Sequence, residues 1–206
     1  MTNNKHYPII VFDFGGVLIN WDPRGLYENL FEGDTVAMEK FFTEVDFMAW
    51  NLEQDKGRSF AEAVAVLSQE FPQYASFIAA YDERWEESIS GPILETVEIL
   101  RLLKQNGYRL FGLSNWSAET FPRIQHKYEF FNWFEGIVLS GAVKLIKPAP
   151  EIYNILLEQI GEPAEKCLFI DDSKPNITTA NELGFMTIHF ESPSQLKTEL
   201  SMRGIL

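Results

Sequence analysis

VFDFGGVL (residues 11–18) is the stretch of sequence that decides the fold of this chain. Its apolar residues continue a run that begins at Ile9, and an apolar run of this length is typical of a strand buried on both faces. The run ends at a carboxylate, Asp13, and the pair Gly15 and Gly16 follows as a turn. In an open parallel sheet, ligands bind beyond the carboxyl ends of the strands, which is where Asp13 is expected.

Four later apolar runs repeat this pattern: residues 109–114, 136–140, 167–171 and 186–190. Helical patterns that begin near Pro92, Ile152 and Ser173 separate the later runs, and each of these patterns ends at a glycine. Strands that alternate with helices predict an α/β fold with a doubly wound parallel sheet, that is, a Rossmann-like core.

Residues 22–90 interrupt this alternation, because they contain helical patterns and no convincing strand. The segment Ser59 to Glu62 has the sequence of a capping box, and apolar residues follow it at helical spacing. Other helical segments are expected near residues 25–31, 35–47 and 77–87. We therefore expect a core of residues 1–20 and 91–206, with a small helical domain of residues 21–90 inserted after the first strand.

The composition excludes several classes of function. The net charge of −13 and the lack of any basic run argue against binding to nucleic acid, which needs surfaces rich in lysine and arginine. The 17 Phe and five Trp residues indicate a large aromatic core or a seam between domains. The single Cys167 lies in an apolar run, which excludes a disulfide within the chain and favours a buried structural thiol.

The chain shows no pattern for export or for membrane insertion. Residues 1–7 are polar, the apolar run after them is too short for a signal peptide, and no run approaches the roughly 18–20 apolar residues of a membrane span. We therefore expect a cytoplasmic protein with no membrane partner. His6, His126 and His189 share no spacing, and we assign them no role.

Polar residues end three of the predicted strands: Asp13, Ser114-Asn115 and Asp171-Asp172. Each alone fits a turn or a helix cap. Two adjacent carboxylates repel each other unless a cation or hydrogen-bond donors relieve them, and with Asp13 they form an oxygen site suited to Mg²⁺. Lys147, followed by Pro148, is placed to reach a phosphate or a carboxylate.

The order of these four elements resembles the haloacid dehalogenase-like superfamily. The matching segments are residues 11–18, 113–115, 147–148 and 169–173, and the helical insert is similar to the cap domain of that superfamily. The resemblance covers nearly the whole chain. It implies a phosphatase that acts on a small phosphorylated metabolite, with a sugar phosphate as one candidate.

The resemblance also implies a role for each matching residue. Asp13 attacks phosphorus and becomes a transient aspartyl phosphate, which splits hydrolysis into two easier steps. Lys147 neutralises charge on the nucleophile and on the phosphate, as the approach of two anions requires. Ser114 and Asn115 hold the phosphoryl oxygens.

Mg²⁺ is the cofactor that the resemblance implies. Its expected ligands are Asp13, the main-chain carbonyl of Gly15, and Asp172, with Asp171 in support from the outer shell. Which member of the acidic pair contacts the metal is left open by the sequence.

One position departs from the superfamily pattern. Phosphatases of the superfamily usually carry a second Asp, two residues after the nucleophile, as general acid and base. In this chain that position is Gly15. Such help is worth about 10²–10⁴-fold in rate. Three explanations compete. The substrate has a good leaving group, which we favour because glycine at this position resembles a branch of sugar-phosphate phosphatases. Alternatively, the cap supplies the acid, with Asp22, Glu53 and Asp55 as candidates, or the protein has lost catalysis and kept phosphate binding.

Residues 50–58 are expected to form a loop that reads the substrate, since they mix an aromatic residue, an amide and both signs of charge around Gly57. The alternative is an ordinary connection between helices. Trp116 follows Asn115 and is expected either to line the pocket or to pack against the cap. The specificity candidates are therefore Trp50, Glu53, Lys56, Arg58 and Trp116.

Three other functions remain as alternatives. A 2-haloacid dehalogenase uses the same aspartate on carbon and needs no metal, so Asp171 and Asp172 argue against it. A non-catalytic protein that binds a phosphorylated metabolite is suggested by Gly15. A phosphohexomutase is disfavoured, because phosphoryl return to a sugar hydroxyl needs a base at that position.

Overall fold

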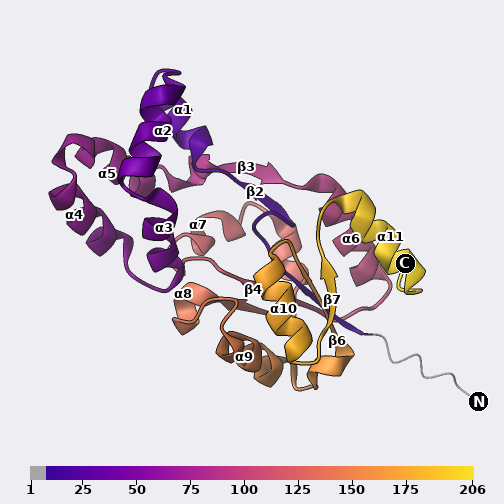
Figure 1. The fold of residues 1–206 in the computed structure, drawn as a ribbon. Helices are drawn as coiled ribbons and strands as arrows, with labels where there is room; N and C mark the ends of the chain where they lie inside the picture. Colours follow the sequence, from indigo (N-terminus) through magenta and orange to yellow (C-terminus); the bar gives the residue numbers. More distant parts are fainter. Residues whose placement is uncertain (1–7) are drawn as a thin grey trace, which may run out of the picture.

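A five-stranded parallel sheet forms the centre of the computed structural model, which describes residues 8–206 (Figure 1). The order is β5-β4-β1-β6-β7, so the first strand is the middle one. The strands are β1 (Ile9–Phe12), β4 (Leu110–Ser114), β5 (Gly136–Leu139), β6 (Cys167–Asp171) and β7 (Met186–His189). All four pairings are parallel. The predicted α/β fold class is confirmed.

Alternate residues of β1 face two separate apolar clusters, as the two-residue repeat of a strand requires. Ile10 and Phe12 belong to a cluster with the helices of one face, and Ile9 and Val11 to a cluster with the helices of the other. The first face is covered by α6 (Leu94–Gln105), α7 (Phe121–Gln125) and α11 (Pro193–Met202), and the second by α9 (Pro150–Ile160) and α10 (Lys174–Glu182).

The inserted segment is helical, as expected, and stands to one side of the sheet (Figure 1). Its helices are α1 (Arg24–Leu30), α2 (Thr35–Glu44), α3 (Phe47–Asp55), α4 (Phe60–Glu70) and α5 (Ala75–Glu83). Ser59 caps α4 by accepting a hydrogen bond from the main-chain N–H of Glu62 at 3.2 Å. Tyr27, Phe41, Phe47 and Tyr81 are buried against one another, so the abundant aromatic residues build the core of this cap.

The structure differs from the sequence-based expectation at three places in the insert. A two-stranded antiparallel ribbon of β2 (Ile19–Trp21) and β3 (Ile89–Pro92) joins core and cap, and strands of three and four residues carry too little periodicity to be recognised. The helix expected over residues 35–47 breaks at Asp46, which has a positive φ of 45°. The helical pattern near residues 77–87 continues beyond α5 only as a 3₁₀ turn, Trp85–Ser88.

The prediction of a loop over residues 50–58 is also wrong, because most of this segment belongs to helix α3. Turn-forming residues occur only at its end, where Gly57 has a φ of +99°. The predicted domain limits fall within the β2–β3 ribbon, and the division of the chain into two independent units remains a prediction.

The remaining elements are short. Helix α8 (Ser140–Val143) follows β5, and 3₁₀ turns cover Pro72–Tyr74, Glu129–Trp133 and Ala164–Lys166. Within residues 8–206, no helix is long and apolar enough to cross a membrane. Cys167 is buried in β6, and burial raises the pKa of its thiol to about 11, as suits a structural residue. His6 lies outside the described residues.

Candidate active site

The ends of three adjacent strands bring the predicted acidic residues together. β1 leads into Asp13, the neighbouring β4 ends at Ser114, and β6, on the other side of β1, leads into Asp171 and Asp172. One carboxylate oxygen from each of the three aspartates lies within 4.8 Å of the others. Residues more than 150 positions apart in sequence therefore form one cluster.

Asp13 is held in a single orientation by its neighbours. Its Oδ1 accepts hydrogen bonds from the Ser114 hydroxyl at 2.8 Å and from the Phe14 N–H at 2.7 Å, and its Oδ2 lies 2.9 Å from Lys147 Nζ. Burial raises the pKa of Asp13 to about 7; Lys147 opposes this shift and Asp171 adds to it. The carboxylate is thus well placed but short of positive charge.

Lys147 lies between two carboxylates and is itself buried. Its Nζ donates to Asp171 Oδ2 at 2.7 Å and to the Leu113 carbonyl at 2.9 Å, besides its contact with Asp13. Burial alone would lower the pKa of this amine, but the two aspartates outweigh burial and raise it. The raised pKa favours the charged form of Lys147 beside Asp13.

The side chain of Asn115 braces the lysine. Its Oδ1 accepts from the Lys147 N–H at 2.8 Å, and its Nδ2 donates to the Lys147 carbonyl at 3.0 Å. Both ends of the amide are engaged with the main chain of Lys147, and one N–H of Nδ2 together with the main-chain N–H of Asn115 remains as a donor for a phosphate. Ser114 keeps its hydroxyl at Asp13.

The two members of the acidic pair differ in their surroundings. Asp171 is fully buried, and both of its oxygens are occupied, by Lys147, by the Ser173 N–H at 2.8 Å and by Asn176 Nδ2 at 3.0 Å. Asp172 is more exposed, and burial together with Asp171 raises the pKa of its carboxyl. Asp171 is therefore a structural anchor, and Asp172 is the member with oxygens available to a ligand.

A divalent cation fits the donor set at this edge. Three carboxylates face one lysine, so the cluster has an excess of negative charge, and oxygen donors of this kind suit Mg²⁺. Gly16 makes room for the approach: its φ is +73°, and a Cβ built there would lie 2.3 Å from Asp172 Oδ2. Only glycine lets the turn after Asp13 pass so close to that carboxylate.

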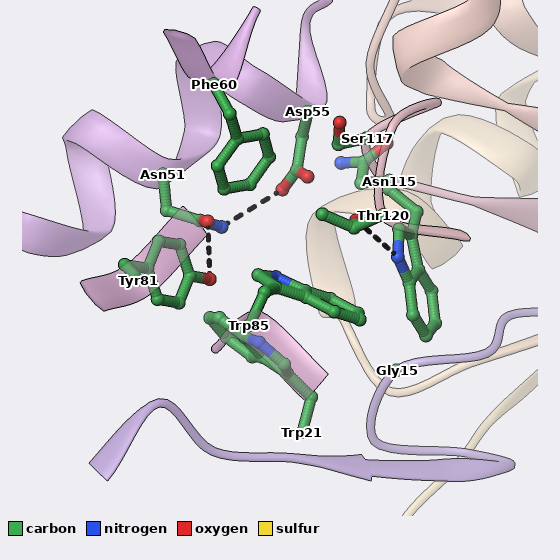
Figure 2. Close-up of a pocket in the computed structure, with 11 residues that line it drawn as sticks. Gly15, Trp21, Asn51, Asp55, Phe60, Tyr81, Trp85, Asn115, Ser117 and Thr120 are labelled. Atoms are coloured by element: carbon green, nitrogen blue, oxygen red, sulfur yellow. Dashed lines mark hydrogen bonds between the residues drawn. The ribbon is translucent and has the colours of Figure 1, made fainter. Parts of the chain in front are cut away.

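A pocket of about 90 Å³ lies between the cap and the core residues Gly15 and Asn115, which are close in sequence to Asp13 and Ser114 (Figure 2). Figure 2 shows that its walls are mostly aromatic rings, with Asp55 and Asn51 of α3 pointing into it from the cap side. Its lining residues are Gly15, Trp21, Asn51, Asp55, Phe60, Tyr81, Trp85, Asn115, Trp116, Ser117 and Thr120. Gly15, two residues after Asp13, is part of the lining, and nothing lies within 4 Å of a Cβ built on it.

The predicted specificity residues divide into two groups. Trp116 lines the pocket, with its indole N–H donated to Thr120 at 3.1 Å. The other four, Trp50, Glu53, Lys56 and Arg58, are not among the residues that line it. The Trp50 indole N–H donates to the Ala63 carbonyl at 3.2 Å within the cap core.

The three charged residues of that group are engaged on the cap itself. Glu53 pairs with Lys56 at 2.6 Å across one helical turn, and both side chains are over 40% exposed. Arg58 donates to Gln54 Oε1 and to the Trp50 carbonyl, each at 2.9 Å. Helix α3 thus directs Glu53 away from the pocket and presents Asn51 and Asp55 to it, while Lys56 and Arg58 follow the end of the helix.

Several residues of the site were missed by sequence reasoning. Asn176 holds Asp171, and the aromatic wall comes from Trp21, Phe60, Tyr81 and Trp85. Asn176 lies five residues after Asp171, a spacing at which the first turn of α10 returns to the strand end. The aromatic residues give no local signal, since their positions depend on how the cap folds over the core.

The model of the haloacid dehalogenase-like hydrolase family matches residues 7–184, which is most of the chain and includes all four segments that carry the predicted site residues. The chain belongs to the haloacid dehalogenase-like hydrolase family. The resemblance stated from the motifs is confirmed, and with it the expectation of a hydrolase.

Two curated relatives match over nearly the full length of both chains. A sesquiterpene phosphatase of Aspergillus oryzae is 25% identical over 87% of this chain and 87% of its own. A D-ribitol-5-phosphate phosphatase of Bacteroides thetaiotaomicron is 24% identical over 94% of this chain and 96% of its own. Another curated relative, 26% identical, is much longer, and this chain covers 35% of its length.

A solved structure of the same family is similar to this chain over most of its length. It is an enzyme from Bacteroides thetaiotaomicron in complex with magnesium and inorganic phosphate, 28% identical, with a TM-score of 0.72. The match covers 92% of this chain and 98% of that one. The fold of this chain is therefore shared along almost its whole length.

Proposed function

We propose that this protein is a Mg²⁺-dependent phosphatase that hydrolyses a small phosphorylated metabolite through an aspartyl phosphate on Asp13. One observation carries the proposal: Asp13 is held between Ser114 and Lys147 at the carboxyl edge of the sheet, within 4.8 Å of Asp171 and Asp172. The relatives support it, since two of them are phosphatases and a third is a family enzyme with magnesium and phosphate bound.

The chain's own residues account for the steps of such a reaction. The Asp13 carboxylate attacks phosphorus, and Ser114 fixes the direction of attack by binding Oδ1 and leaving Oδ2 toward the lysine. Lys147 offsets the negative charge that builds up as the two anions meet. In the second step water displaces Asp13 from phosphorus and regenerates the free carboxylate.

Asp13, Asp172 and the main-chain carbonyl of Gly15 are the groups proposed to hold Mg²⁺, with Asp171 in support through Lys147 and Asn176. When bound, the ion supplies positive charge to the phosphate and to the attacking carboxylate, and so lowers their mutual repulsion. The raised pKa of Asp13 agrees with a site that is completed by a cation.

The substrate is proposed to be compact. The pocket of about 90 Å³ holds a small leaving group against aromatic rings. Two kinds of leaving group suit such walls: the face of a sugar or polyol, and a short apolar chain. The two phosphatase relatives act on a polyol phosphate and on a sesquiterpene, by their names. A 2-haloacid dehalogenase stays the less favoured alternative, because it has no use for Asp172.

Release of inorganic phosphate from p-nitrophenyl phosphate tests the proposal. We expect activity with Mg²⁺, loss of activity with EDTA, and recovery when Mg²⁺ is added back. Asp13→Asn is expected to lower turnover by about 10⁴-fold or more, since it removes the nucleophile.

Two outcomes would contradict the proposal. Activity that persists in EDTA, or in Asp13→Asn with an unchanged circular dichroism spectrum, would reject the assignment of the metal or of the nucleophile. Phosphate binding without any turnover would instead support a non-catalytic protein that binds a phosphorylated metabolite.

A further inference from the structure

Asp55 is the one carboxylate among the residues that line the pocket within the described part of the chain. It lies at the last position of α3, at the end of the helix nearest the core. In Figure 2 its carboxyl group points into the pocket from the side of the cap, while Gly15 lies on the opposite side. An acid is thus present in the pocket, but on the cap instead of beside the nucleophile.

The position of Asp55 relative to the nucleophile is fixed by contacts between cap and core. The Ser140 hydroxyl donates to the Asp55 carbonyl at 2.6 Å, and the same hydroxyl accepts from the Trp116 N–H at 2.9 Å. Next to Asp55, Gly57 passes so near the core that a Cβ on it would lie 2.9 Å from the Gly141 carbonyl. The main chain that carries the acid is therefore attached to the edge of the sheet.

A chain of hydrogen bonds orients the carboxyl group. The Tyr81 hydroxyl lies in the pocket wall with Trp21 and Trp85, and it donates to Asn51 Oδ1 at 2.8 Å. The amide of Asn51 is thereby turned so that Nδ2 faces Asp55 Oδ2 at 3.4 Å.

The other acids considered for this role lie elsewhere. Asp22 is exposed and accepts a hydrogen bond from the main-chain N–H of Arg24 at 2.9 Å. Glu53 is paired with Lys56 on the outside of the cap. Neither of the two lines the pocket.

We infer that Asp55 is the general acid and base of this phosphatase, and that it replaces the carboxylate missing at Gly15. The inference rests on the proposed function of the site. It also names the class of substrate: phosphate monoesters of ordinary alcohols, whose leaving oxygen needs a proton, are within the reach of this enzyme.

The proton balance is complete with groups of this chain. As the bond from Asp13 to phosphorus forms, the bond from phosphorus to the ester oxygen breaks, and that oxygen takes the proton of Asp55 and leaves as an alcohol. The Asp55 carboxylate then takes a proton from water as the water oxygen attacks the aspartyl phosphate. Phosphate leaves, and Asp13 and Asp55 return to their starting states.

The protonation of Asp55 suits this double role. Burial raises the pKa of its carboxyl to about 7, a hydrogen bond from the Ser117 N–H opposes the shift, and the charge of Asp13 adds to it. Asp13 and the buried Tyr81 are the titratable groups that interact with it. An acid of this pKa both gives and takes a proton near neutral pH.

The test compares two substrates in the Mg²⁺-loaded enzyme and in two variants. p-Nitrophenyl phosphate needs no acid, whereas an alkyl phosphate such as glycerol 3-phosphate or ribitol 5-phosphate does. Asp55→Asn is expected to lower kcat/KM for the alkyl phosphate by about 10²–10⁴-fold and to change p-nitrophenyl phosphate by less than about threefold. A series of substituted phenyl phosphates should show a steeper dependence on leaving-group pKa in the variant.

Asp46→Asn is the matched control. Asp46 lies at the other end of α3, is exposed, and makes no side-chain capping bond there. Its positive φ is well tolerated by asparagine, so the control should leave both substrates unaffected.

The outcomes separate this inference from the proposed function. Equal losses on both substrates, an intact rate on alkyl phosphates in Asp55→Asn, or a wild type that accepts only activated esters would each overturn the role of Asp55. The assignment of Asp13 would survive all three results. It fails only if Asp13→Asn retains activity or if the wild type releases phosphate from no substrate at all.

Discussion

The carboxyl edge of the sheet and the cap pocket lie side by side but are built in different ways. At the edge, the two most buried charged groups have several partners each: Lys147 makes three contacts, and Asp171 accepts at both oxygens. In the pocket, Asp55 is the one acid among aromatic rings, and its polar neighbours are the Asn51 amide and the main-chain N–H of Ser117. In the proposed mechanism the edge supplies fixed charge that stabilises the transition state, and the pocket supplies an acid that can change charge.

This difference separates groups that the sheet positions from groups that the cap positions. Groups at strand ends are positioned by the sheet itself, so a change there alters the chemistry. Groups on the cap are positioned by helix packing, and a change there alters which leaving group is accepted.

Removal of the charge at the edge should have the largest effect. Lys147→Met leaves Asp13 and Asp171 buried without their counter-ion, which costs about 3–5 kcal/mol of unfolding free energy. Urea unfolding measures this loss, and exposed Lys197→Met is the control, with an expected change within about 0.5 kcal/mol. A loss below about 1 kcal/mol would show that the edge does not depend on its lysine.

The pH dependence of catalysis tests the pocket next. The phosphorylation step needs Asp55 protonated, and its pKa is raised to about 7, so kcat/KM for an alkyl phosphate should fall about tenfold per pH unit above that value. In Asp55→Asn this alkaline limb should disappear, leaving a low profile that no longer falls at high pH. An unchanged limb in the variant would assign the titration to another group.

A carboxylate introduced in the core at position 15 should compensate for the loss of the Asp55 carboxylate in the cap. Gly15 has space for a Cβ, so Gly15→Asp in the Asp55→Asn background is expected to recover alkyl phosphate hydrolysis by about 10–100-fold. The single variant Gly15→Asp in the wild-type background measures any harm that the new charge does. No recovery, with p-nitrophenyl phosphate activity intact, would mean that the two positions are not equivalent.

The smallest effect is expected outside the pocket. Glu53→Gln breaks an exposed pair with Lys56, which changes unfolding free energy by less than about 0.5 kcal/mol. It should leave kcat/KM unchanged for both classes of substrate. A change in kcat/KM for one class of substrate and not the other would show that residues 53–58 contribute to specificity.

Much of the core could be predicted from the sequence because its signals are local. Each buried parallel strand is a continuous apolar run that ends in a polar residue, and this pattern places Asp13, Ser114 and Asp171 at one edge without any coordinates. The β2–β3 ribbon escaped notice because strands of three and four residues show no repeat.

The pocket could not be predicted to the same degree, because its residues come from distant parts of the chain. Asp55 was one of three candidate acids, and nothing in the sequence distinguished it from Glu53, two residues before it. The difference is a matter of helical phase: α3 directs Asn51 and Asp55, four residues apart, to the same side, and Glu53 to the solvent. That phase became visible only once α3 was known to be a helix.

The hydrogen bond from Ser140 to the main chain of Asp55 joins two halves of a reaction that are carried by separate bodies. In the proposed mechanism the nucleophile belongs to the sheet and the proton donor to the cap, so both are in place only while this contact holds. If the cap opens to admit a substrate, this mechanism requires it to close again before the alcohol can leave. An ester too bulky to allow closure would then be spared even when its phosphate reaches Asp13.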